Sequence, residues 1–186
     1  MLILGIDPGS LTTGYGLVRA EGDRLTAVDF GAIATRSALP FPERLRQIFD
    51  ALRGIMAHRR PDAAAVEGGF FARNVQSAIK LGQARGVALL AAALEGVPVF
   101  EYAPRQVKGA VSGFGGAEKS QVQVMVKAML GLREIPSPAD AADALALAIC
   151  HHHAAGVRRR LTPVVPPAPA PRPPAHTGPR GRARPQ

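Results

Sequence analysis

The sequence predicts an α/β fold built on a mixed β-sheet, and two patterns along the chain lead to that prediction. Three strand-like runs, over residues 2–6, 13–18 and 25–34, follow one another with only short turns between them, which predicts an antiparallel meander. After them, helical periodicity alternates with short apolar runs, which is typical of α/β architecture. With 186 residues and 47% hydrophobic side chains, the chain is long and apolar enough for one packed domain.

Each later element carries its own signal. From residue 43 to about residue 58, apolar residues recur on one helical face, and Pro61 ends the pattern. The apolar run 63–67 is typical of a buried strand. Ser137-Pro138 predicts the start of the last helix, with serine as its cap and proline in its first turn. The other expected elements are a helix over 74–94, a strand over 97–102 and a helix over 118–130.

The C-terminal tail carries most of the net charge. Seven of the 23 basic residues lie after Gly156 with no acidic residue among them, which leaves 16 basic and 14 acidic residues in the body. The tail also contains nine of the 17 prolines, which remove backbone donors and prevent helix formation. We therefore expect one domain over residues 1–156 and a disordered Pro/Arg-rich tail over 157–186. The charge of +9 describes the tail more than the domain, so by itself it is weak evidence for nucleic-acid binding.

The sequence also narrows the expected compartment. It contains no run of about 18 apolar residues, so we expect no membrane-spanning helix and no membrane partner. The N-terminus lacks the basic segment and cleavage site of a signal peptide. Cys150 is the only cysteine, which excludes an internal disulfide and fits a reducing compartment. We expect a cytoplasmic protein.

Four acidic residues form a candidate site. Asp7 ends the first strand directly before a Pro-Gly turn, where an Asx-turn explains it equally well. Glu67 closes an apolar strand and precedes two glycines, and burying a lone carboxylate is costly unless it is paired or bound to a cation. Asp140 and Asp143 lie three residues apart in the first turns of a helix, where acids also favour the helix dipole.

Together these carboxylates suit divalent cations. Mg²⁺ and Mn²⁺ are hard cations that prefer oxygen ligands, and two such ions about 4 Å apart can hydrolyse a phosphodiester. Our hypothesis assigns one ion to Asp7, shared with Asp140 or Asp143, and the other to Glu67. Periodicity alone leaves open whether the four acids converge on one point.

A series of short motifs occurs in a fixed order over about residues 1–155. They are Gly5-Ile-Asp-Pro-Gly-Ser10, Thr13-Gly-Tyr-Gly16, Lys80-Leu-Gly-Gln-Ala-Arg-Gly-Val87, Val99-Phe-Glu-Tyr102, Gln106-Val-Lys108, Ala117-Glu-Lys-Ser-Gln-Val122 and Ala139-Asp-Ala-Ala-Asp-Ala-Leu-Ala146. Any one of them is weak evidence, but the ordered set closely resembles the RuvC family, the crossover-junction endodeoxyribonucleases of bacteria.

That resemblance implies a fold, an activity and partners. The implied fold is RNase H-like, and the implied activity is a pair of symmetric nicks across a four-way (Holliday) DNA junction, leaving 5′-phosphate and 3′-hydroxyl ends. The implied cofactor is Mg²⁺, two ions per active site, with Mn²⁺ expected to substitute. The implied partners are junction DNA, a second copy of the chain and the branch-migration helicase complex.

The resemblance also implies residue roles. Four positions match the family's catalytic, metal-binding acids: Asp7, Glu67, Asp140 and Asp143. Lys108 and Lys119 match basic residues that contact DNA near the cleavage point, and Lys119 is expected to stabilise charge in the transition state. Gly82 and Gly86 allow a close helix approach, and the resemblance places their helix at the dimer interface. Ordinary packing against the sheet is the alternative for that helix.

The loop that begins at Gly68-Gly69 is the expected DNA-facing segment. By family position Phe70 is expected to stack on an unpaired base, worth about 1–3 kcal/mol, and Arg73 to hold a phosphate. Burial in the core is the alternative for either phenylalanine. Gly68-Gly69 and Phe71 depart from the family pattern, so the sequence leaves the shape of the loop open.

Three rival functions fit part of the sequence. The motif around Asp7 also resembles the first phosphate loop of actin-like ATPases and sugar kinases, but their second glycine-rich loop and greater length are missing. A sister nuclease that processes ribosomal RNA precursors is a closer rival, and the blocks containing Lys80 and Lys119 favour the junction resolvase. The third rival is a junction-binding scaffold without catalysis, against which the four retained acids argue.

Overall fold

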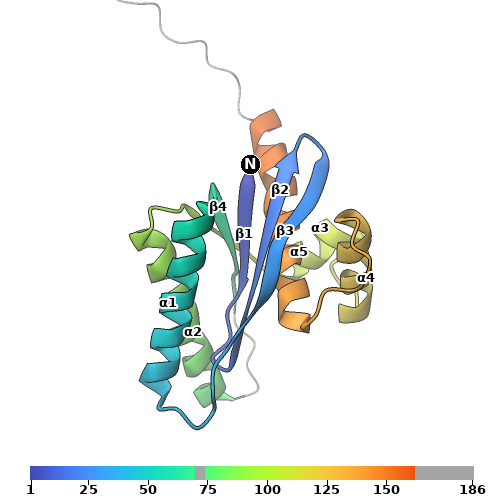
Figure 1. Ribbon diagram of the computed structural model, residues 1–186. Helices are drawn as coiled ribbons and strands as arrows, with labels where there is room; N and C mark the ends of the chain where they lie inside the picture. The colour runs from blue at the N-terminus through green and yellow to red at the C-terminus, as the bar shows by residue number, and fades with distance from the viewer. Residues whose placement is uncertain (70–73, 162–186) are drawn as a thin grey trace, which may run out of the picture.

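The computed structural model of the protein describes residues 1–69 and 74–161. Five strands form one mixed sheet in the order β3-β2-β1-β4-β5 (Figure 1). The strands are β1 (Leu2–Asp7), β2 (Thr12–Glu21), β3 (Arg24–Ala34), β4 (Ala63–Glu67) and β5 (Val99–Tyr102). The first three pair antiparallel, whereas β1–β4 and β4–β5 pair parallel. The predicted mixed sheet with an N-terminal meander is therefore confirmed.

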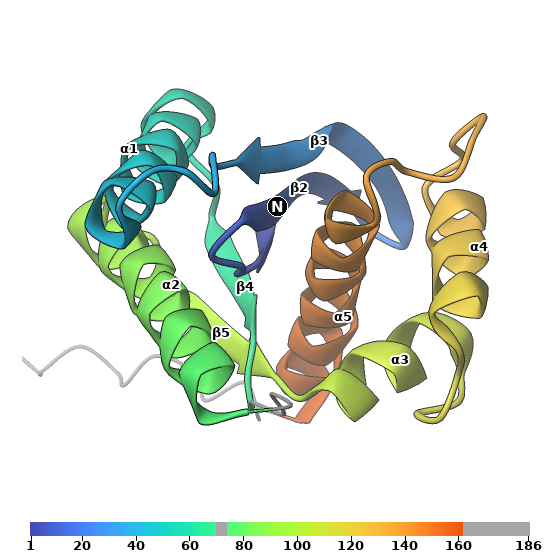
Figure 2. The same ribbon diagram turned by 90° about the horizontal axis from the view of Figure 1, so that it is seen from below.

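Within the described residues, five helices lie on the two faces of the sheet. Helices α1 and α2 cover one face, and α3, α4 and α5 lie on the other (Figures 1 and 2). Their bounds are α1 Phe41–Arg59, α2 Val75–Leu94, α3 Pro104–Ser112, α4 Lys119–Met129 and α5 Ala139–Leu161. In the part of the chain that the structure describes, none of these helices is long and apolar enough to cross a membrane.

Two elements differ from the sequence-based expectation. Helix α3 was not predicted, because it is short and buries only Val107 and Val111, too few positions for a periodic signal. Helix α5 runs to Leu161, past the domain boundary expected at residue 156. The rest of the expected tail, residues 162–186, lies outside the described residues, as do Phe70 and Arg73.

The two cores fix which way each residue of β1 faces. Ile3 belongs to the core under α3, α4 and α5, whereas Leu4 and Ile6 belong to the core under α1 and α2. Because side chains alternate along a strand, Gly5 and Asp7 share the face of Ile3. Asp7 is therefore presented on the face that α5 covers.

Glycines on that face let α5 lie directly against the sheet. A Cβ added at Gly5 would lie 1.8 Å from the carbonyl oxygen of Ala144, and one added at Gly14 would lie 2.0 Å from that of Asp140. Gly14 is the β2 partner of Asp7 in the antiparallel register. The backbone contact therefore places the beginning of α5 next to the end of β1.

This close packing makes a stability prediction. Gly5→Ala should lower the free energy of unfolding by about 1–3 kcal/mol or more, because the new methyl group has to displace the α5 backbone. The matched control is Gly54→Ala on α1, where an added Cβ meets nothing within 4 Å, and which should be neutral or stabilise by about 0.5–1 kcal/mol. Equal stability of the two variants in chemical denaturation would contradict the packing argument.

Candidate active site

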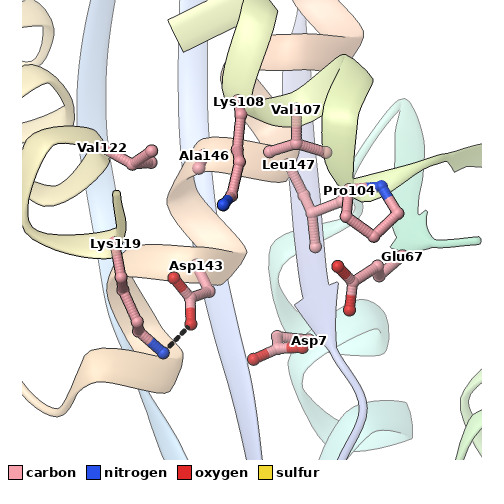
Figure 3. A pocket seen from close by; sticks show the side chains of 10 residues that line it. All are labelled: Asp7, Glu67, Pro104, Val107, Lys108, Lys119, Val122, Asp143, Ala146 and Leu147. Atoms are coloured by element: carbon pink, nitrogen blue, oxygen red, sulfur yellow. Dashed lines mark hydrogen bonds and ion pairs between the residues drawn. The ribbon is translucent and has the colours of Figure 1, made fainter. Parts of the chain in front are cut away.

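Three of the four predicted acids line one cavity. The cavity has a volume of about 270 Å³. Its lining residues are Asp7, Glu67, Pro104, Val107, Lys108, Lys119, Val122, Asp143, Ala146 and Leu147. Figure 3 shows the carboxylates of Asp7, Glu67 and Asp143 around this space, with the ammonium group of Lys108 pointing into it. The lining thus combines apolar side chains with three carboxylates and two ammonium groups.

The fold brings these acids together from distant parts of the sequence. Asp7 and Glu67 are the last residues of β1 and β4, and the parallel register that pairs Ile6 with Val66 places both acids at the same end of the sheet. Asp143 comes from the beginning of α5, which is held there by the glycine contacts.

Asp140 lies beside the cavity but is not one of its lining residues. Its backbone carbonyl is the group that a Cβ at Gly14 would strike. Its negative charge nevertheless acts on Asp7, whose pKa it helps to raise. The first two turns of α5 thus contribute one acid to the cavity wall, Asp143, and a second that acts from its edge, Asp140.

The crowding of like charges is visible in the pKa values. Burial raises the pKa of Asp7 to about 7, and the negative charges of Asp143, Glu67 and Asp140 add to that effect, while Lys119 opposes it. Burial and the charge of Asp143 also raise the pKa of Glu67. Without a cation, protonated and ionised Asp7 are therefore present in comparable amounts near neutral pH.

Lys119 supplies positive charge at the N-terminus of α4. Its ammonium nitrogen lies 2.5 Å from the Oδ2 atom of Asp143 (Figure 3). Partial burial lowers the pKa of Lys119, but the hydrogen bond and the charge of Asp143 outweigh this effect, and the net direction is upward. The lysine therefore stays protonated at neutral pH.

The donor set fits a hard divalent cation, since it consists of carboxylate oxygens that are otherwise forced together. Among the residues with described side chains, no three acidic, histidine or cysteine groups are arranged to hold one ion as they stand. Asp143 is ion-paired with Lys119 instead. A cation in this cavity would compete with Lys119 for that carboxylate.

Sequence reasoning missed parts of this site. Pro104 and Val107 form one wall and belong to the unpredicted α3. Pro104 at the first helical position was an available signal for that helix. Arg85 lies within a motif noted above but was assigned no role, and it donates a hydrogen bond to the backbone of Glu67.

The raised pKa of Asp7 makes stability depend on pH. A carboxyl group whose pKa is higher in the folded chain contributes stability that is fully present below about pH 4 and is lost as the pH rises through about 7. In metal-free buffer Asp7→Asn should therefore unfold at a higher temperature than the parent at about pH 8, with the difference shrinking towards about pH 4.

The matched control for this experiment is Asp23→Asn in the exposed turn between β2 and β3. It should leave the pH dependence of the melting temperature unchanged. The assigned electrostatics would be contradicted if the melting temperatures of the parent and Asp7→Asn differed by the same amount at about pH 8 and at about pH 4.

Comparisons with known proteins agree with this geometry. The family model described as crossover junction endodeoxyribonuclease RuvC matches residues 3–151. A crossover junction endodeoxyribonuclease RuvC of Citrifermentans bemidjiense is 59% identical, over 84% of this chain and 95% of the relative. The solved structure of Thermus thermophilus RuvC is 40% identical with a TM-score of 0.79, covering 85% of this chain and 97% of that one.

A second T. thermophilus structure, of RuvC in complex with a Holliday junction substrate, is 38% identical with a TM-score of 0.78. It covers 84% of this chain and 96% of that chain. The predicted family resemblance and fold class are thus confirmed. The chain belongs to the RuvC family of crossover junction endodeoxyribonucleases.

Proposed function

We propose that four carboxylates form the catalytic, metal-binding set of this Holliday junction resolvase: Asp7, Glu67, Asp140 and Asp143. Family membership gives the activity, a crossover junction endodeoxyribonuclease, and a 38% identical relative has been solved with a Holliday junction substrate. One observation carries the residue assignment. Acids from β1, β4 and α5 meet at a cavity rimmed by two lysines, which is an arrangement for handling a phosphodiester with bound cations.

Each acid would have a role in cation binding that follows from its position in the site. Asp7, central between the other acids, would be a shared cation ligand, with Asp140 or Asp143 on one side and Glu67 on the other. Two divalent ions held there, Mg²⁺ or Mn²⁺, would supply the Lewis acidity for activating water and neutralising the leaving 3′ oxygen. Lys119 is protonated and would stabilise negative charge at the scissile phosphate.

Lys108 enters the cavity from α3 (Figure 3) and would hold the DNA backbone by charge. The roles of Phe70 and Arg73 in DNA binding are proposed from the family resemblance alone. Phe70 would stack on a base and Arg73 would contact a phosphate. On the same family resemblance we propose cooperation with a branch-migration helicase complex and a bacterial cytoplasmic location.

A homodimer is proposed through α2. Four large apolar side chains of this helix are exposed, namely Val75, Ile79, Leu90 and Leu94. Their spacing of three or four residues per step, continued through Gly82 and Gly86, describes one stripe, and a Cβ at either glycine would meet nothing within 4 Å. Two copies joined along this stripe would give the two equivalent sites that symmetric nicking needs.

Sedimentation equilibrium should show a dimer that Leu90→Arg converts to monomer, and a monomeric parent at micromolar concentration would refute the interface.

Junction cleavage tests the carboxylate assignment. Asp7→Asn and Asp143→Asn should each lower the rate of nicking of a labelled four-way junction with Mg²⁺ by at least about 10³-fold, because several kcal/mol of transition-state stabilisation is lost. Binding of the junction should survive in both variants. Lys119→Met should also bind but cut about 10²-fold more slowly.

Two comparisons keep this test specific. Lys127→Met, on the same helix as Lys119 but outside the cavity lining, should cut at the parent rate. A linear duplex and a structured ribosomal RNA precursor should be poor substrates beside the junction. Undiminished cutting by Asp7→Asn would refute the assignment, and a parent protein that binds without cutting would favour the scaffold alternative.

A further inference from the structure

Arg85 connects helix α2 to the strand end that carries Glu67. Its Nε atom donates a hydrogen bond to the backbone carbonyl of Glu67 at 3.2 Å, and its guanidinium group forms an ion pair with Glu101 on β5. The Arg85 side chain is only 16% exposed, whereas that of Glu101 is 51% exposed. One planar group with several fixed donors thus contacts both β4 and β5 just behind the active-site cavity.

The sequence after Glu67 is adapted to this contact. A Cβ at Gly68 would lie 3.3 Å from the Cβ of Glu101 and 3.5 Å from its Oε2 atom, so the missing side chain leaves room for Glu101 to reach Arg85. The Gly68 amide donates to the carbonyl of Tyr102 at 2.8 Å. Gly69 then has a φ of +99°, which glycine adopts without strain. The contacts of Arg85 with Glu67 and Glu101 therefore hold the end of β4 at Gly68, just before the expected DNA-facing loop.

The end of β4 needs these contacts because the carboxylate of Glu67 faces another negative charge. Glu67 is the last residue of its strand, and the like charge of Asp143 lies close enough to raise its pKa. Repulsion between the two carboxylates acts to push the end of β4 away from α5, where only β5 pairs with it beyond Val66. A hydrogen bond to the Glu67 carbonyl resists that displacement while leaving the carboxylate free for the cavity.

We propose that Arg85 is a positioning residue for junction cleavage. It holds the backbone of Glu67 so that the carboxylate of Glu67 stays close to those of Asp7 and Asp143. This inference rests on the proposed role of Glu67 as a cation ligand. Arg85 touches neither DNA nor the reacting atoms in this account. It acts through the Glu67 carbonyl, with Glu101 orienting the guanidinium group.

Substitution of Arg85 gives the test, with a readout that needs no catalysis. In metal-free protein, Arg85→Met should speed hydrogen exchange of the Gly68 amide, because the strand end is released. With the junction as substrate, it should raise the Mg²⁺ concentration for half-maximal cleavage about 10- to 100-fold, the usual cost of losing support for a metal ligand. Arg85→Lys should recover only part of either effect, since a single ammonium group cannot replace the planar fork. Junction binding in EDTA should be unchanged.

Arg53→Met is the matched control. Arg53 on α1 forms an ion pair of 2.6 Å with Glu95, which follows the last residue of α2, and neither residue lines the cavity. Loss of this ion pair should alter neither readout. Normal Mg²⁺ dependence and normal Gly68 exchange in Arg85→Met would overturn the inference. So would a loss of activity that follows a lower melting temperature with the Mg²⁺ dependence unchanged. Full cleavage by Glu67→Gln would instead overturn the proposed function of Glu67, which separates the two failures.

Discussion

The active site depends on the direct contact between helix α5 and the backbone of β1 and β2. Two glycines on adjacent strands, Gly5 and Gly14, leave no side chain between the sheet and the helix. Any larger residue would lift α5 away and separate its acids from Asp7. This packing depends on the close fit of the two surfaces. Protein interiors are dense, so even one added methyl group forces the neighbouring backbone to move. The contact between α5 and the sheet therefore fixes the distance between the acids of α5 and Asp7.

That fixed distance has an electrostatic cost. Burial and the neighbouring negative charges raise the pKa of Asp7 to about 7, and the free protein offsets part of the repulsion with the ion pair between Lys119 and Asp143. Bound cations relieve the same repulsion more completely. The site is therefore less stable alone than with its ligands, which is a common property of catalytic centres whose charges are matched to a reacting phosphate.

The sequence predicted the strands and the acids at their ends well, since Asp7 and Glu67 each close an apolar run before glycine. It could not show that they converge, because convergence follows from the parallel register of β1 with β4 and from backbone contacts that leave no periodic signal. Helix α3 was missed because two buried valines are too few to show a period. The bond from Arg85 to a backbone carbonyl was invisible for a similar reason, since any residue at position 67 offers that carbonyl. The resemblance to the RuvC family supplied roles that spacing alone left open.

Folding brings three of these acids to one cavity and the fourth beside it, and we propose that together they form one divalent-cation site. Anomalous diffraction from crystals of the full chain grown with Mn²⁺ tests it most directly, because the metal is located independently of any assumed mechanism. We expect an ion bound to Asp7 and to at least one of the acids from β4 and α5, at oxygen distances of about 2.0–2.2 Å. Ions found only elsewhere, with Asp7 still facing its neighbours without metal, would contradict it.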